Sequence, residues 1–205
     1  WLQKIEQASL TCIDTETTSL DAMQAELVGI SLSVKVGEAC YVPVAHRTGE
    51  EQLDRAWVLA QLKPWLENPN AKKVGQNLKY DIHVLENYQI AMQGVTHDTL
   101  MESYVLESHL SHGMDSLAER HLGMKTIHYE HVCGKVVHQI GFDQVDLKIA
   151  TDYAAEDADI TLRLHQFLWP QLEQEPGLRY VYELFEMAAT RVFVFMDGSG
   201  LTSGS

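Results

Sequence analysis

The sequence has few cysteines, few basic residues and no long apolar run, and each shortage argues against some classes of protein. Its cysteines, Cys12, Cys40 and Cys133, lie far apart, are odd in number and form no CxxC motif. This usage favours a reduced, cytoplasmic protein with small buried thiols. No stretch of about 18 apolar residues occurs, so no membrane span is expected. The first residues also lack the basic and then apolar layout of a signal peptide.

Acidic residues outnumber basic ones. The chain has 15 Lys and Arg against 29 Asp and Glu, which gives a formal net charge of −14 with the histidines neutral. Lys and Arg supply most of the affinity of proteins that coat long nucleic acid, because they neutralise phosphates. The composition therefore disfavours such a protein, but it leaves open one that takes a short strand end through bound metal ions.

The length of 205 residues fits one large domain with a substantial core. Residues 1–8 have the pattern of a helix end. Alternating apolar residues then predict strands over 10–16, 26–34 and 39–44, joined by short loops into an antiparallel meander. The rest of the chain predicts helices over 51–66, 77–88, 99–108, 114–122, 146–169 and 178–196, a short strand over 72–75 and a loop region over 125–141. This order predicts an α/β domain with a mixed sheet.

The first predicted strand ends in two carboxylates. Asp14 and Glu16 are two residues apart, so their side chains project from the same face of the strand. No neighbouring Lys or Arg neutralises them, and two like charges this close repel strongly unless a cation lies between them. A D-x-E pair alone is usually solvated surface, so the question is whether other segments supply further ligands.

Two later segments supply such groups. Asn77 and Asp81 are four residues apart and share a helix face, and Tyr153 and Asp157 repeat that spacing. Alone, these residues would be a helix cap and solvated side chains. Together with the first pair, the oxygen ligands favour Mg²⁺ or Mn²⁺ over zinc. Two such ions, about 3.5–4 Å apart, stabilise the attacking and leaving oxygens of an in-line displacement at phosphorus. A phenol one turn from a ligand is placed to aim the attacking water.

Several blocks of the chain resemble, in order, the proofreading 3′–5′ exonuclease domain of bacterial family A DNA polymerases. The resemblance covers nearly the whole chain, and its blocks are Ile13-Asp-Thr-Glu-Thr-Thr-Ser-Leu20, Tyr41-Val-Pro-Val-Ala-His46, Val74-Gly-Gln-Asn-Leu-Lys-Tyr-Asp81, Asp98-Thr-Leu-Met-Glu-Ser-Tyr104, Met114-Asp-Ser-Leu-Ala-Glu-Arg120 and Tyr153-Ala-Ala-Glu-Asp-Ala-Asp159. The wider group is the tyrosine-bearing branch of the DEDD exonucleases. The resemblance therefore implies an RNase H-like fold, a mixed β-sheet flanked by helices.

The resemblance also implies roles for the carboxylates. It implies two divalent metal ions, Mg²⁺ or Mn²⁺, held by Asp14, Glu16, Asp81 and Asp157. Of these, Asp14, Glu16 and Asp157 would hold the ion that carries the attacking water. Asp14 would bridge to the second ion, which Asp81 would reach through water. Tyr153 would orient the nucleophile.

The implied substrate is the 3′ end of single-stranded DNA. Gln76 and Asn77 match residues that contact the strand near its 3′ end, and Leu20 matches an apolar side chain wedged against the terminal base. Thr17 begins the edge on which the terminal nucleotide would rest. Phe142 matches a second base-contacting position, with ordinary core as its simpler interpretation. A short strand held by stacking and metal–phosphate contacts needs few basic residues.

In this family the domain continues into a polymerase, which would be the partner within the parent chain. We expect the exonuclease domain over residues 1–175. Over residues 176–205 we expect a connector helix toward the absent polymerase domain and a disordered or artificial tail. The domain would be monomeric, with the nucleoid of the bacterial cytoplasm as its location. The histidines in the middle of the chain are expected on the surface: His97, His109, His112, His121, His128, His131 and His138.

Three alternatives remain open. An RNA 3′-exonuclease of the RNase D type shares the carboxylates and the tyrosine, and it differs in 2′-hydroxyl contacts that a sequence does not reveal. A catalytically silent scaffold domain of a polymerase would be expected to lack one of the metal carboxylates. A domain that only binds a protein partner would show no dependence on divalent ions.

Overall fold

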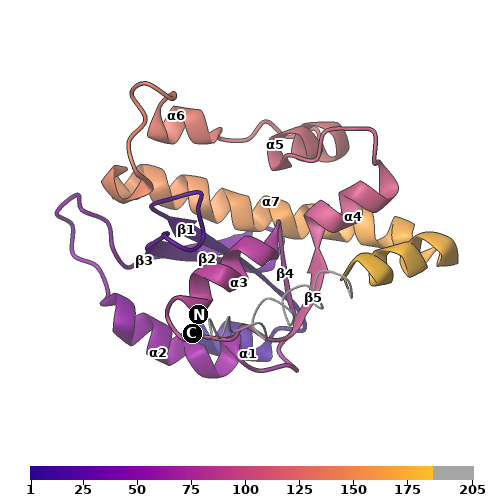
Figure 1. Ribbon diagram of the computed structural model, residues 1–205, viewed down its shortest axis with the longest axis horizontal. Coiled ribbons are helices and arrows are strands. Elements are labelled where there is room, and N and C mark those ends of the chain that lie inside the picture. Colours follow the sequence, from indigo (N-terminus) through magenta and orange to yellow (C-terminus); the bar gives the residue numbers. More distant parts are fainter. Residues whose placement is uncertain (187–205) are drawn as a thin grey trace, which may run out of the picture.

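The computed structural model describes residues 1–186, and its central element is a strand that runs between two layers of helices (Figure 1). The strands are β1 (Thr11–Thr17), β2 (Leu27–Lys35), β3 (Glu38–Pro43), β4 (Lys73–Gly75) and β5 (Val95–Asp98). The helices are α1 (Leu2–Gln7), α2 (Arg55–Leu66), α3 (Leu78–Glu86), α4 (Thr99–Leu106), α5 (Met114–Leu117), α6 (Tyr129–Cys133) and α7 (Leu147–Glu173). The predicted α/β fold with a mixed sheet is confirmed.

The strands form one five-stranded sheet in the order β3-β2-β1-β4-β5. β1, β2 and β3 are the antiparallel meander that the sequence predicts. β4 then pairs in parallel with β1, and β5 pairs in parallel with β4. β5 is an addition to the predicted elements. Its four residues are all half-buried, so they show neither the alternation nor the apolar run by which strands are recognised.

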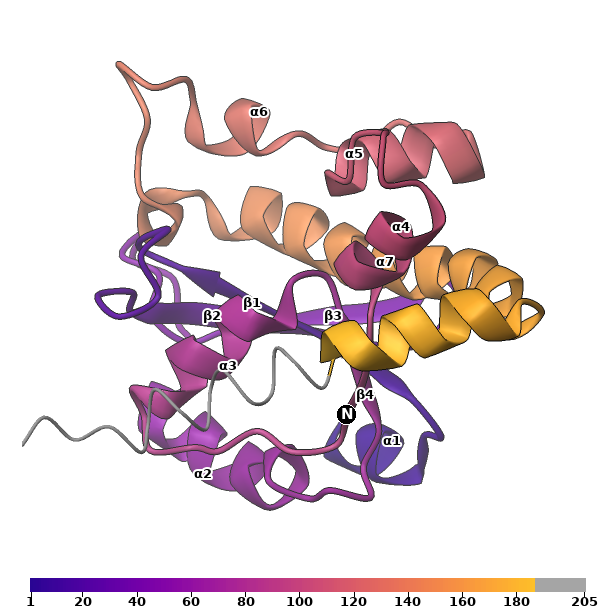
Figure 2. The ribbon, with the colours of Figure 1, turned by 45° about the vertical axis from the view of Figure 1, so that its right-hand side comes forward.

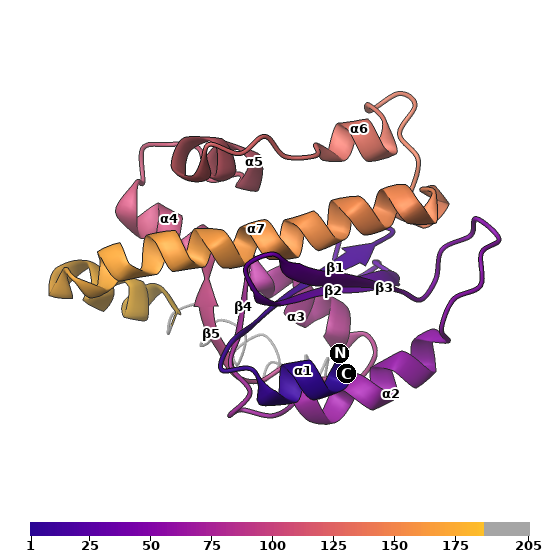
Figure 3. The ribbon, with the colours of Figure 1, turned by 180° about the vertical axis from the view of Figure 1, so that it is seen from behind.

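The side chains of β1 alternate between the two faces of the sheet. Ile13 packs with Leu78 of α3 in the larger core cluster, on the side covered by α1, α2 and α3. Cys12 points the other way and packs with Ala158 of α7. Figures 1 and 3 show these two layers from opposite sides, and Figure 2 shows α5 and α6 lying beyond α7. Asp14 and Glu16 share the face of Cys12, because alternate residues of a strand point the same way.

α7 is the long helix that the sequence predicts over residues 146–169. It begins after Asp146, whose carboxylate accepts hydrogen bonds from two backbone N–H groups of the first turn, and it continues past Trp169 to Glu173. Ala150, Ala154 and Ala158 are fully buried. Their small side chains let the helix lie close on the sheet.

Three segments differ from expectation in detail. The predicted loop over 125–141 contains the short helix α6. The predicted helix over 114–122 is α5 followed by a π-helical turn, Ala118–Leu122. Residues 176–186, where the connector helix is expected, are helical, while the expected continuation to Met196 and the tail lie outside the described residues. Within residues 1–186, no helix is long and apolar enough to cross a membrane.

Candidate active site

Three of the predicted metal ligands converge where β1 meets the middle of α7. Asp14, Glu16 and Asp157 each bring one carboxylate oxygen into a group whose atoms lie within 4.8 Å of one another. Oδ1 of Asp157 is buried and has no hydrogen-bond partner among the described residues. An unpaired buried polar atom is unfavourable. This unpaired oxygen and the neighbouring carboxylates fit a cation as the missing partner.

Burial raises the pKa of every carboxyl in this group. Desolvation raises the pKa of Asp14 to about 7. It also raises the pKa values of Glu16 and Asp157 well above their ordinary range, and the negative charge of Asp14 adds to both shifts. A bound divalent ion would offset the repulsion and favour the ionised form. The donor set, oxygen only, suits a hard ion such as Mg²⁺ or Mn²⁺.

Tyr153 lies one helical turn before Asp157 and lines the same pocket. Its ring centroid is 5.9 Å from that of Phe142 and 6.1 Å from that of Tyr129. A hydrogen bond from its phenol lowers the pKa of Asp157 and so offsets part of the effect of burial. The pKa of Tyr153 itself is raised by burial and then by the charge of Asp157, so the phenol keeps its proton. It can therefore donate a hydrogen bond at the site.

Asp81 approaches the strand from α3, on the other side of the sheet. β4 pairs with β1 only as far as Cys12, and Asp81 accepts the N–H of Thr15 at 3.0 Å and also its hydroxyl. Gly75 lets β4 lie close to β1, because a Cβ there would lie 2.9 Å from the carbonyl oxygen of Ile13. Asp81 is not in the group of three carboxylates. Its pKa is raised by burial first and then by the charge of Asp14, so the two carboxyls interact electrostatically.

A pocket opens over these carboxylates, between the turn after β1 and the segment that follows α6. Thr17 and Leu20 both line it, and Leu20 is 94% exposed. Tyr80 holds the turn in place through hydrogen bonds to the hydroxyl of Thr17 and the carbonyl of Ser19. Leu20 therefore presents an exposed apolar side chain at the edge of the pocket.

Sequence reasoning missed several residues that line this pocket: Tyr80, Tyr129, Gln139, Ile140 and Gly141. Tyr80 directly precedes Asp81 in a block that was recognised, so its place in that block is a usable signal. The other residues belong to the region interpreted as a loop. Nothing in their local pattern shows that this loop folds back over β1.

Gln76 and Asn77 are not among the residues that line the pocket. The side-chain amide of Gln76 donates to the carbonyl of His112 at 3.0 Å and its oxygen accepts from Thr99. Asn77 is exposed and has left-handed backbone angles, with φ of 59°. It stands at the predicted N-cap position, but its side chain makes no capping bond. The Asp98 carboxylate accepts the N–H of Asn77 at 2.9 Å instead.

Phe142 is 1% exposed and belongs to the core. Its ring packs against Tyr41 with a centroid distance of 6.3 Å and lies behind Tyr153. Gly29 makes room for this arrangement, since a Cβ there would overlap the ring of Tyr41. The expected base contact of Phe142 is therefore corrected: the ring supports Tyr153 from behind and offers no exposed face to a nucleotide.

The fold is shared with solved nuclease structures. NrnC of Brucella melitensis superposes with a TM-score of 0.69 at 18% identity, over 97% of this chain and 92% of that chain. RNase D of Escherichia coli, an exoribonuclease, superposes with a TM-score of 0.69 at 17% identity, over 93% of this chain and 46% of that chain. At such identities the likeness shows the fold alone, which is the RNase H-like class.

Sequence relationships narrow this class. A family model described as 3′-5′ exonuclease matches residues 1–173. DNA polymerase I of Pseudomonas aeruginosa is 52% identical over 205 residues, which cover 98% of this chain and 22% of that protein. DNA polymerase I of Rhizobium leguminosarum is 41% identical over 222 residues, with the same coverage of 98% and 22%. The chain belongs to the 3′–5′ exonuclease domain family of DNA polymerase I. It spans about a fifth of the length of these relatives.

Proposed function

We propose that this chain is a two-metal-ion exonuclease that removes nucleoside 5′-monophosphates from DNA 3′ ends. In its parent chain it would be the proofreading module beside a polymerase domain. The observation that supports this best is the convergence of Asp14, Glu16 and Asp157, with ligand atoms within 4.8 Å, beside the phenol of Tyr153 in an open pocket.

The four carboxylates would together bind two metal ions. Asp14, Glu16 and Asp157 would hold one, and Asp14 with Asp81 the other. Bound Mg²⁺ or Mn²⁺ supplies neutralisation of charge at phosphorus and a water of lowered pKa. Tyr153 would orient that water, because its phenol stays protonated and lies one turn from Asp157.

The edge of the pocket would hold the terminal nucleotide. Tyr80 fixes the turn that begins at Thr17, so Leu20 projects as an exposed apolar side chain on which the last base can rest. Gln76 and Asn77 remain expected contacts for the strand near its 3′ end. The sparse basic residues suit a domain that takes only a strand tip, with the duplex held by the polymerase domain of the parent chain.

DNA is favoured over RNA because whole-chain identity to DNA polymerase I reaches 52%, whereas the likeness to RNase D is structural at 17% identity. A silent scaffold is disfavoured because all four carboxylates and the tyrosine are present.

A time course on a 5′-labelled single strand tests the proposal. Matched DNA and RNA oligonucleotides are incubated with Mg²⁺, and EDTA is then added. We expect DNA to shorten from its 3′ end and digestion to stop on chelation. Asp157→Ala should abolish digestion, whereas Asp152→Ala, a change at a carboxylate on the same helix whose side chain is 60% exposed, should retain it. Faster trimming of RNA, or activity that persists in EDTA or in Asp157→Ala, would contradict the proposal.

A further inference from the structure

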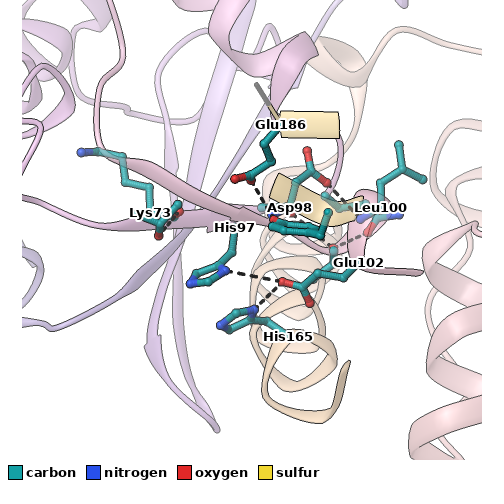
Figure 4. Close-up of polar contacts among 12 residues, drawn as sticks. Lys73, His97, Asp98, Leu100, Glu102, His165 and Glu186 are labelled. Carbon is teal, nitrogen blue, oxygen red and sulfur yellow. Dashed lines mark hydrogen bonds and ion pairs between the residues drawn. The ribbon is translucent and has the colours of Figure 1, made fainter. Parts of the chain in front are cut away.

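A second group of metal-ligating side chains lies where β5 and α4 meet the later turns of α7. His97, Glu102 and His165 each bring one ligand atom into a group whose atoms lie within 4.8 Å of one another. Nδ1 of His165 is 2.7 Å from Oε1 of Glu102, and Nδ1 of His97 is 3.9 Å from the same oxygen. Figure 4 shows both imidazoles pointing toward the Glu102 carboxylate. The expectation that His97 is a surface residue is therefore corrected.

Two atoms of this cluster are buried without a hydrogen bond. Within residues 1–186, Oε2 of Glu102 and Nδ1 of His97 have no such partner, and the Glu102 side chain is completely buried. A direct bond between Glu102 and His165 satisfies only one oxygen and one nitrogen. Both unpaired atoms belong to residues of the same cluster, which is the arrangement expected of a site that lacks its cation.

We propose that His97, Glu102 and His165 bind one Zn²⁺ ion. Two imidazoles and one carboxylate are a ligand set that zinc takes, with water in the fourth position, whereas Mg²⁺ and Ca²⁺ prefer oxygen ligands alone. Ligand atoms around tetrahedral zinc are separated by about 3.4 Å, since each lies about 2.0–2.2 Å from the ion. The present contacts of 2.7 and 3.9 Å bracket that separation. Small side-chain movements would therefore complete the site.

The surroundings suit a bound ion that stays in place. The Trp169 ring lies 4.4 Å from that of His97 and 5.4 Å from that of Tyr182, centroid to centroid, so aromatic rings wall the cluster. The side chain of His97 is 18% exposed, which leaves a route for the ion.

This site is separate from the nuclease centre. His165 follows Asp157 by eight residues on the same helix, which corresponds to about 12 Å along its axis. The ion would fasten the junction of β5 and α4 to α7. Its effect is therefore expected on stability and on metal content, without a direct part in hydrolysis.

The test first replaces two of the four nuclease carboxylates, so that the nuclease site takes up less zinc. In an Asp14→Asn, Asp157→Asn background, Zn²⁺ binding is measured by titration calorimetry and by metal content after dialysis. We expect one tight equivalent. His97→Phe and Glu102→Gln should each weaken it by more than about 100-fold, because even outer-shell partners are worth about 10–100-fold. His121→Gln, which removes an imidazole paired with Glu107 outside the cluster, should leave it unchanged.

Co²⁺ gives a measurement that does not depend on the stability of the variants. In the same background, Co²⁺ should show the intense visible absorption of a tetrahedral site, and Zn²⁺ should displace it. Weak octahedral absorption would overturn the proposal. Equal zinc affinity in the background protein and in folded His97→Phe, judged by circular dichroism, would also overturn it.

Discussion

Each carboxylate of the site is held in surroundings that favour its neutral form. Asp14, with a pKa raised to about 7, is close to half-ionised at neutral pH when no cation is bound. The same carboxylate raises the pKa values of Glu16, Asp81 and Asp157. The metal-free site is therefore electrostatically strained, and Asp14 is its common member.

Asp14→Asn should separate activity from stability. We expect hydrolysis to fall by more than about 10³-fold, beyond the loss of a single hydrogen-bond donor. Unfolding of the metal-free protein at pH 8 should become less favourable by about 1–3 kcal/mol, because one pKa unit corresponds to about 1.4 kcal/mol. Nuclease assays and denaturant titrations measure the two effects. A variant that is inactive because it is unfolded, or one that keeps wild-type hydrolysis, would contradict this expectation.

Tyr153→Phe removes only the phenol oxygen. We expect kcat to fall by about 100-fold, less than for loss of a carboxylate, because an orienting hydrogen bond is lost and no ligand is removed. The Mg²⁺ concentration that gives half-maximal activity should stay the same. Single-turnover assays across a Mg²⁺ series measure both quantities, and a large shift in the Mg²⁺ requirement would indicate that Tyr153 acts through the metal instead.

The regular strands and helices of this chain are easier to predict from its sequence than the segments that connect them. The meander and α7 follow from periodicity, because their apolar residues recur at strand and helix spacing. β5 does not, since it is short and half-buried on both faces. The Asp98 carboxylate caps α4, and it also caps α3 in place of Asn77. That second bond joins residues 21 positions apart, and local pattern cannot show it.

In the candidate site too, the residues on regular elements were predictable from the sequence and those on loops were not. Asp14, Glu16 and Asp157 were predicted together, and strand and helix periodicity fixes where they point. For Phe142 the sequence left a base contact and ordinary core both open, because a lone aromatic residue in an irregular segment carries no sign of its burial. The loop after α6 was left without a role, although Ile140 lines the pocket. Contacts that depend on how a loop folds back require the three-dimensional structure.

The aromatic packing behind the site gives a prediction for Phe142, a buried residue that supports the site from behind. Phe142→Ala should lower the free energy of unfolding by about 3–5 kcal/mol, as expected for a buried aromatic ring. It should also reduce kcat, because Tyr153 loses the ring against which it packs. Phe167→Ala, at a site 42% exposed, serves as control and should change both quantities little. Chemical denaturation and nuclease assays would show whether Phe142 instead contacts substrate, in which case KM would rise while stability held.

At the scale of the whole molecule, the buried carboxyls make stability depend on pH and on divalent ions together. The pKa of Asp14 is about 7 in the folded state against an ordinary value of 3.8, so the folded chain holds more protons between these values. Stability of the metal-free protein should therefore fall as pH rises through this window. His97 and His165 act in the opposite sense, but only from about pH 4 to about 6.5.

Thermal unfolding measured from pH 6.5 to pH 8 tests this relation. We expect the Tm of the metal-free protein to fall across this pH range. With Mg²⁺ the slope of Tm against pH should flatten, because the bound ion replaces the bound protons. Asp14→Asn should show a shallower slope without metal. Glu186, with a pKa raised to about 7, contributes the same sign in both proteins and so cancels in the comparison. Identical slopes in wild type and variant would assign the pH dependence to groups outside the site.

α7 carries Tyr153 and Asp157 in its interior turns, and the sheet covers it along Ala150, Ala154 and Ala158. A segment packed in this way opens only when the domain itself unfolds. Amide hydrogens of residues 153–158 should therefore exchange with deuterium at the rate of global unfolding, while those of 136–140 exchange earlier. Mass-resolved exchange can measure this difference. We therefore expect Tyr153 and Asp157 to stay in place while Gln139 and Ile140, in the wall of the pocket, open.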